Sequence, residues 1–270
     1  MKAKYFLCLF LGLLSFLSSC SDDHGLAPLP GRLLVDIKFH GTPPANTQGI
    51  YLIVTPDFPP HAINELFHSS NSLPIGLDSV HTEIDLPLGH YDAISLWWYS
   101  NDTKSNLADV LSLPLDINNN LLPLGFDLTT SQPQHQMNLV ANWDKVNRDA
   151  SIEGTIYFNG PFPVNTLATA VAAYRYKPTV SVEYLTFLKS IDFSVGTNPY
   201  HFKLPVRNGN IEYLAVFWLP ENSNLTEFQT IGVYENPAQP GEPAKFRVKT
   251  GEALTGLDIQ ADWSKISNPQ

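Results

Sequence analysis

The residues that end at Cys20 carry the clearest chemistry in the sequence, because they match a site of cysteine acylation. Lys2 and Lys4 precede an apolar stretch over residues 5–17, and small residues then lead to Cys20. This order is that of a bacterial lipobox, and the apolar run is shorter than the roughly 20 residues that span a bilayer. The sequence therefore predicts that residues 1–19 are a lipoprotein signal peptide and that the thiol of Cys20 is lipidated. An ordinary secretory signal with an incidental cysteine is the alternative.

Lipidation at Cys20 makes the membrane a predicted partner and residues 20–30 a lipidated tether. Ser21-Asp22-Asp23 resembles the acidic signal of Bacteroidetes lipoproteins that are sent to the outer surface, although acidic linkers also serve solubility alone. We therefore expect a protein anchored in the outer membrane, with the cell surface and the periplasmic face both open. The other cysteine, Cys8, lies in the signal, so the mature body has no disulfide and no cysteine-based zinc site.

The eight histidines and the acidic turns offer weak metal candidates. His61 and His68 flank a short segment but lack a metal-binding spacing, and we expect solvated loop histidines instead. Residues 116–120 alternate oxygen-bearing side chains as a calcium loop does, yet Leu121 stands where the loop needs glycine, which favours a simple turn. No nucleophile elbow or phosphate-binding glycine loop is present. The sequence predicts no metal, no cofactor and no catalytic residue; a carboxylate pair brought together only by the fold is the alternative.

Aromatic residues give the one candidate ligand site. Along a strand, Trp97 and Tyr99 point to one face and Trp98 to the other. Flat rings stack on sugar C–H groups, and Asn101 and Asp102 follow closely enough to hold hydroxyls. Tyr99, Trp97, Asn101 and Asp102 are therefore the predicted ligand-binding residues, with aromatic packing inside the core as the alternative.

Composition excludes one large class of partner. Of the 270 residues, 26 are acidic and 16 basic, giving a formal charge of −10 at pH 7. A row of phosphates needs cations to neutralise it, so we expect no nucleic-acid partner.

Self-similarity is the strongest structural signal. Phe39-His40-Gly41 recurs as Phe158-Asn159-Gly160, at an offset of 119 residues, and the segment 139–146 resembles 259–266. A repeat of this length indicates two copies of one domain. We place the copies at residues 31–147 and 148–270, and the short linker implies that they touch or sit in a fairly fixed relation.

Apolar residues alternate within each copy, as residues 33–39 and 152–158 show. Period-two segments with frequent turn signals predict an all-β fold, here two tandem antiparallel β-sandwich domains of about seven strands each, related by internal duplication. Residues 61–67 and 184–189 are the only helical candidates.

Three segments of the second copy carry a family resemblance: residues 152–161, 231–234 and 257–263. They resemble the transthyretin-like, or carboxypeptidase regulatory-like, domains of bacterial lipoproteins; the first copy is less similar, with Val35 in place of Gly154. The resemblance implies a prealbumin-like sandwich that serves as an accessory or adhesive module and brings no catalytic residues.

These observations predict a lipid-anchored envelope protein that acts as a non-catalytic binding or scaffolding module, whose partner is another envelope protein or a glycan. A carbohydrate-binding surface lipoprotein is the alternative function. An enzyme would require a cleft with a clustered acid–base pair.

Overall fold

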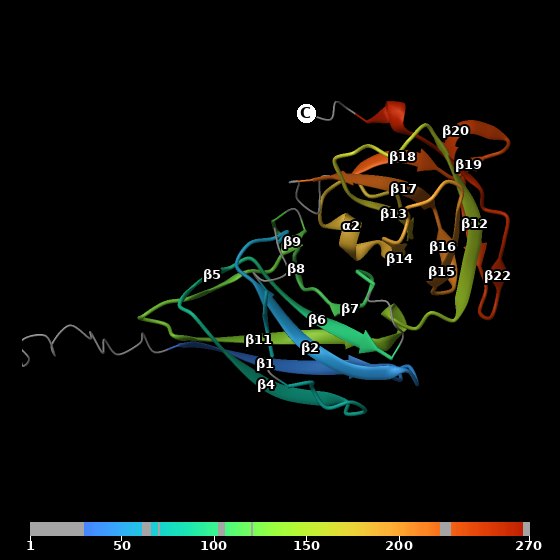
Figure 1. Ribbon diagram of the computed structural model, residues 1–270. Coiled ribbons are helices and arrows are strands. Elements are labelled where there is room, and N and C mark those ends of the chain that lie inside the picture. The colour runs from blue at the N-terminus through green and yellow to red at the C-terminus, as the bar shows by residue number, and fades with distance from the viewer. Residues whose placement is uncertain are drawn as a thin grey trace, which may run out of the picture.

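The chain folds into two β-rich lobes that follow one another in sequence (Figure 1). The computed structural model describes residues 30–60, 66–69, 71–101, 106–119, 121–221 and 228–266. The predicted signal peptide, Cys20 and most of the tether lie outside the described residues. No helix in the described part of the chain is long and apolar enough to cross a membrane.

The first lobe is a sandwich of two sheets. One sheet has the order β11–β1–β4 and the other β3–β2–β6–β7. Their bounds are β1 (Gly31–His40), β2 (Thr47–Thr55), β3 (Phe67–His68), β4 (Ser79–Leu86), β6 (Ala93–Ser100), β7 (Val110–Ser112) and β11 (Gln134–Asn142). Two short pairs extend it: β5 (Gly89–Tyr91) with β10 (Phe126–Leu128), and β8 (Leu115–Asp116) with β9 (Leu122–Pro123). The two sheets hold the predicted seven strands.

The second lobe repeats this plan. Its main sheet has the order β14–β13–β17–β18–β23–β12–β15, with β22 also paired to β12. The bounds are β12 (Ala150–Asn159), β13 (Thr166–Tyr174), β14 (Leu188–Asp192), β15 (Tyr200–Val206), β17 (Tyr213–Pro220), β18 (Gln229–Val233), β22 (Ala253–Leu254) and β23 (Ile259–Asp262). Short pairs again extend it: β16 (Gly209–Ile211) with β21 (Phe246–Val248), and β19 (Glu235–Asn236) with β20 (Gln239–Pro243). A single bridge between Gly232 and Ala261 joins its two halves.

Each sandwich encloses its own apolar core, built as the period-two pattern predicts. On β6 the side chains of Ile94, Leu96 and Trp98 are buried, and on β17 those of Leu214, Val216 and Trp218 occupy the equivalent positions. Trp98 Nε1 donates to Thr47 Oγ1 at 3.0 Å. In the second core Trp218 Nε1 donates to Thr166 Oγ1 at 2.8 Å. A buried indole N–H needs such a partner, and the same solution in both cores confirms the duplication.

The two copies also end alike. Each closes with a 3₁₀ turn, η3 (Trp143–Lys145) and η4 (Trp263–Lys265). The side chain of Asn142 caps the first turn and that of Asp262 caps the second. The Trp143 ring stacks on Phe39 at 5.5 Å between centroids, and that of Trp263 stacks on Phe158 at 5.1 Å.

The direction of one strand pair differs from the expected antiparallel arrangement. The first and last long strands of each copy pair in parallel, β1 with β11 and β12 with β23. Nearly the whole copy lies between the two strands, which gives the chain room to return and run in the same direction. Each sandwich is therefore antiparallel except for the parallel pairing of its first and last long strands.

The helical predictions have different outcomes. Most of segment 61–67 lies outside the described residues, and its last residue, Phe67, belongs to β3. A short helix, α2 (Glu183–Thr186), does form where the second candidate begins, and the chain is extended again from Leu188.

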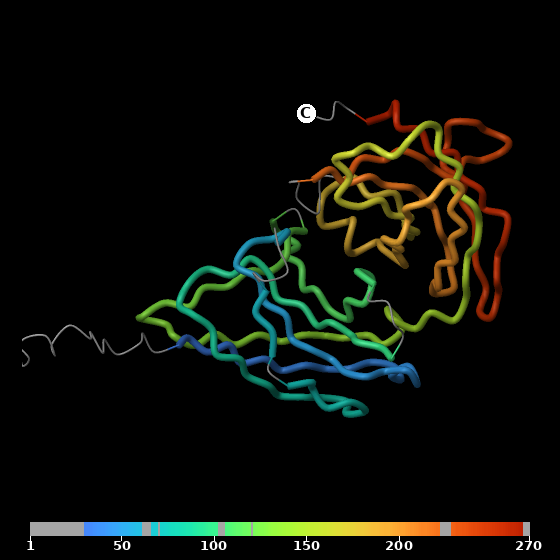
Figure 2. The backbone as a smooth tube through the Cα atoms, in the orientation of Figure 1, coloured from blue at the N-terminus to red at the C-terminus, as the bar shows by residue number. Residues whose placement is uncertain are grey.

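The two sandwiches touch, as the short linker implies (Figure 2). The outer face of β13 and β17, which carries Tyr174 and Phe217, packs in an apolar cluster with Leu107 and Ala108 of the first sandwich. Asn106 adds polar contacts, since its Nδ2 donates to Ser190 Oγ at 3.0 Å and to the Ile191 carbonyl at 3.1 Å. β13 and β17 are thus buried on both faces, one against their own core and one against the other lobe.

Candidate functional site

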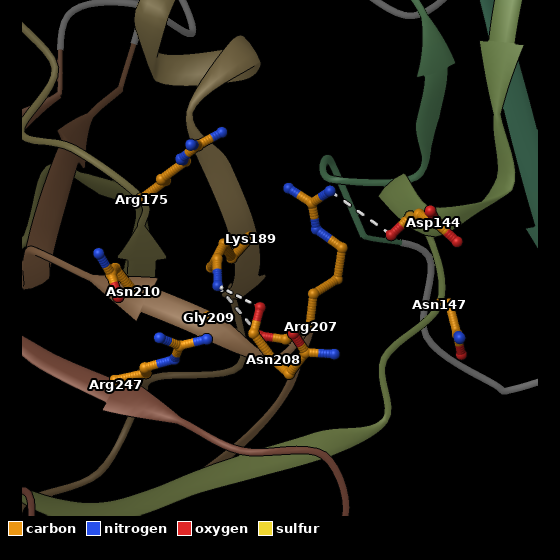
Figure 3. Close-up of a pocket in the computed structure, with 9 residues that line it drawn as sticks. All are labelled: Asp144, Asn147, Arg175, Lys189, Arg207, Asn208, Gly209, Asn210 and Arg247. Carbon is orange, nitrogen blue, oxygen red and sulfur yellow. Dashed lines mark hydrogen bonds between the residues drawn. The ribbon is translucent and has the colours of Figure 1, made fainter.

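A cleft of about 550 Å³ lies where the end of the second sandwich meets the last turn of the first (Figure 3). Lys189 of β14 lines it from the second lobe, and Asp144 and Asn147 line it from the end of the first. We call it the basic cleft and define it by its lining: Asp144, Asn147, Arg175, Lys189, Arg207, Asn208, Gly209, Asn210 and Arg247.

Four cations reach the basic cleft from four different segments. Arg175 follows β13, Lys189 lies on β14, Arg207 follows β15 and Arg247 lies on β21. Elsewhere, cations such as Lys203 and Lys245 form salt bridges with carboxylates. Within the described ranges, none of these four is part of a salt bridge. The cleft therefore gathers four cations against one lining carboxylate, that of Asp144, in a protein of net charge −10.

Lys189 is the most buried of the four, with 3% of its surface exposed. Its ammonium donates to the carbonyls of Arg207 and Asn208, both at 3.0 Å. Burial, together with the charges of Arg207 and Arg175, lowers the pKa of Lys189 to about 8, while the charge of Asp149 acts in the opposite direction. The ammonium is therefore poorly neutralised, and an anion in the cleft would stabilise its charged form.

Arg207 crosses from the second sandwich toward the first. Its Nη1 donates to the backbone carbonyl of Asp144 at 3.4 Å (Figure 3), and its Nε is buried without a partner. Burial lowers the pKa of the guanidinium, and so do the charges of Arg148 and Arg175. A buried donor with no acceptor costs about 1–3 kcal/mol, which a ligand oxygen would recover.

This donor set suits an oxyanion. Guanidinium groups bind sulfate, phosphate and carboxylate through paired hydrogen bonds, and an ammonium adds a point charge. The lining holds no histidine, serine or cysteine, and no group of three metal-ligating side chains occurs among the described residues. The arrangement can thus bind an anion, with Lys189 as the one amine in its lining.

Arg148 lies next to Asn147 of the basic cleft and, unlike the four cations of the cleft, forms a salt bridge within the described residues. Its Nη2 forms a salt bridge with Asp109 Oδ1 at 2.6 Å, and both side chains are almost fully buried. The guanidinium also lies 5.8 Å from the centre of the Trp98 ring. This buried pair ties the linker to the first sandwich and holds the basic cleft in place.

The aromatic residues predicted to bind a ligand do not lie in the basic cleft. Tyr99 is 46% exposed, and its ring meets Tyr51 edge-on, with centroids 6.5 Å apart and an interplanar angle of 87°. Trp97 faces the second lobe, and the backbone N–H of Asn101 donates to the Asn46 carbonyl at 2.9 Å. Asp102 lies outside the described residues, so the predicted sugar platform stays a prediction.

Carboxylates hold one histidine of the first sandwich, and the segment that resembles a calcium loop forms a turn. His90 is held between Asp127, at 2.8 Å, and Asp92, at 3.1 Å, and the hydrogen bond to Asp127 raises its pKa. The Asp116 segment forms a turn, in which the Asn118 N–H donates to Asp116 Oδ1 at 2.9 Å.

Sequence reasoning missed all four cations of the basic cleft, because they are scattered over more than 70 residues. A comparison of the two copies nevertheless holds a signal for these cations. The equivalent positions of Arg175, Arg207 and Arg247 in the first copy are Pro56, Pro87 and Asp127. The second copy thus carries a positive charge at three positions where the first copy has none, and these positions lie at one end of the sandwich.

Comparisons with known proteins show distant likenesses only. No protein-family model matches the chain, and no curated protein matches its sequence. Among solved structures, a leucine-rich repeat protein from Bacteroides thetaiotaomicron aligns over 86% of this chain (11% identity, TM-score 0.32), and the chain spans 26% of that protein. The resemblance to transthyretin-like domains stays a prediction.

Two further structures align over most of both chains. One is a candidate adhesin from Bacteroides ovatus, which aligns over 92% of this chain and 96% of its own (10% identity, TM-score 0.28). The other is the minor pilin of Streptococcus agalactiae, which aligns over 88% of this chain and 98% of its own (10% identity, TM-score 0.25). The function of the chain has to be inferred from its own residues.

Proposed function

We propose that this chain is a non-catalytic binding module of the cell envelope, anchored in the outer membrane through Cys20, that binds an anionic group in the basic cleft. The observation that carries the proposal is the convergence of Arg175, Lys189, Arg207 and Arg247, none of which forms a salt bridge with a carboxylate of the described residues. Cations that share a site repel one another, and an arrangement of this kind is stabilised by the anion it binds.

Titration with sulfate tests the proposal directly, because sulfate is a small oxyanion without other recognition features. We expect the full chain to bind one sulfate with saturation in isothermal titration calorimetry. Sodium chloride at matched ionic strength serves as the control for general screening. A heat signal that does not saturate, or that chloride reproduces, would contradict the proposal.

The affinity for sulfate is predicted to fall as the pH rises through about 8. Below its pKa of about 8 Lys189 carries a charge, and above it the cleft loses that charge. Bound sulfate favours the protonated form and raises the pKa, so binding takes up protons in this window. We expect about tenfold weaker binding at pH 9 than at pH 7, over which range sulfate does not titrate.

The matched variant for this prediction is Lys189→Gln, which has no proton to lose. Its sulfate affinity is expected to be low and independent of pH between 7 and 9. A flat profile in the wild-type chain would show that Lys189 takes no part in binding.

The anchor makes a separate prediction. Cys20→Ala removes the acylated thiol, so the protein is expected to lose incorporation of an alkyne fatty acid and to move from the detergent phase to the aqueous phase. Circular dichroism of the folded body is expected to be unchanged. Cys8→Ala is the control, because Cys8 lies in the predicted signal peptide. A Cys20→Ala protein that still carries label would exclude this anchor.

A further inference from the structure

The basic cleft is one of three neighbouring hollows where the sandwiches meet. A second hollow of about 270 Å³, the connecting hollow, shares the walls Arg175 and Arg207 with the cleft. A third of about 140 Å³, the apolar hollow, shares Val110, Leu113, Leu185 and Leu188 with the connecting hollow. The three spaces are therefore neighbours with common walls, and they run from charged to apolar surroundings.

The apolar hollow has walls from both sandwiches. The first sandwich contributes the outer face of β2 and β6, including Ile53 and Trp97. The second contributes Tyr174, Tyr184 and Phe228. The volume of the apolar hollow, about 140 Å³, is close to that of a cavity that holds benzene, which is about six carbon atoms.

We infer that the ligand of this chain is an anionic amphiphile, whose acid group lies between Arg175 and Arg207 and whose short apolar tail passes Leu185 into the apolar hollow. This inference rests on the proposed function, since it adds an apolar tail to the anion that is proposed to bind in the basic cleft. The adjacency of the spaces supports it: the two arginines line both the basic cleft and the connecting hollow, and Leu185 lines both the connecting and the apolar hollows.

The occupant is a single molecule and not a membrane surface. Both the cationic and the apolar walls line recesses where the two lobes meet, and a flat bilayer does not reach into such a recess. The net charge of −10 also repels a bilayer rich in anionic lipids. One small amphiphile satisfies the local charge and the apolar walls together.

Three probes separate the contributions of head and tail: methyl phosphate, hexyl phosphate and hexanol, each titrated into the full chain. Burial of a methylene is worth about 0.8 kcal/mol and a tenfold change in affinity needs about 1.4 kcal/mol, so hexyl phosphate is expected to bind at least about tenfold more tightly than methyl phosphate. Hexanol, which lacks the charge, is expected to bind more weakly than either.

The outcomes distinguish this inference from the proposed function. Equal affinities for methyl and hexyl phosphate would overturn the amphiphile but leave anion binding intact. Binding of neither phosphate would overturn both. Hexanol that binds as tightly as hexyl phosphate would show that the charged head contributes nothing.

Two variants test where the apolar tail of the ligand binds. Leu185→Asn places a polar group at the junction of the connecting and apolar hollows, and is expected to abolish the advantage of hexyl over methyl phosphate while the affinity for methyl phosphate stays unchanged. Val164→Asn is the control, because Val164 is fully exposed and lines none of the three spaces. Retention of the advantage in Leu185→Asn would place the tail elsewhere.

A spectroscopic measurement does not depend on that variant folding well. Bromine quenches indole fluorescence on contact, so 6-bromohexyl phosphate is expected to quench part of the wild-type emission. Trp97→Phe is expected to lose this quenching. Quenching that persists in Trp97→Phe would contradict the assignment of the tail to the apolar hollow.

Discussion

Gly154→Val is expected to destabilise the second sandwich by about 3 kcal/mol, although valine is the residue at the equivalent position of the first. A Cβ at position 154 would overlap the carbonyl group of Leu257. That carbonyl belongs to the backbone, so the overlap is relieved only by displacing the strands. Chemical denaturation followed by circular dichroism and tryptophan fluorescence measures the effect.

The reason lies in the last strand of each copy. In the first copy β11 pairs with β1 continuously, and Val35 lies opposite Met137. In the second copy the strand is interrupted between β22 and β23, and the Leu257 N–H donates to the Glu153 carbonyl at 3.1 Å. The interruption brings the Leu257 backbone over Gly154, where only glycine leaves room.

Gly89→Ala is the matched control for this substitution. A Cβ at position 89 would meet no atom within 4 Å, so the free energy of unfolding is expected to change by less than about 1 kcal/mol. Equal stabilities of Gly154→Val and Gly89→Ala would contradict the interrupted strand.

Removal of single arginines from the basic cleft is expected to weaken sulfate binding strongly. Arg175→Gln and Arg247→Gln each keep a long polar side chain but remove the charge. Hydrogen bonds to charged groups contribute about 1.5–3 kcal/mol, so each variant is expected to lose at least about tenfold in affinity. Both side chains are exposed, so we expect the fold to be unaffected.

The control is Arg32→Gln, which lowers the net charge equally. Arg32 lies on β1 of the first sandwich and does not line the basic cleft; its Nε contacts Asp85 Oδ1 at 2.8 Å. Its replacement is expected to change sulfate affinity by less than about twofold, because exposed charges more than a Debye length away are screened. An equal loss in all three variants would show that sulfate responds to overall charge and not to the basic cleft.

Much of the fold was predictable, because it depends on patterns that are local in sequence or repeated along it. Alternation over residues 33–39 identified a strand, and the recurrence at an offset of 119 identified the second copy. The parallel pairing of β1 with β11 was not predictable from these signals, since alternation has the same period in both directions.

The site was harder to predict because it depends on how the two copies meet. Trp97 and Tyr99 do share one face of β6, as alternation requires, but only Trp97 lies against the second lobe. The cations Arg175 and Arg247 are 72 residues apart and converge only through the sheet order of the second sandwich. Local patterns do not encode that order.

The central claim is that an oxyanion binds in the basic cleft, and NMR of the arginine side chains tests it most directly. With ¹⁵N-labelled arginine in the full chain, the Nε–H resonances of Arg175, Arg207 and Arg247 are expected to shift with a common dissociation constant as sulfate is added. The resonance of Arg32 is expected to stay in place, since its Nε–H donates to Asp85. Shifts of equal size at Arg32, or no saturating shift at Arg207, would contradict the account.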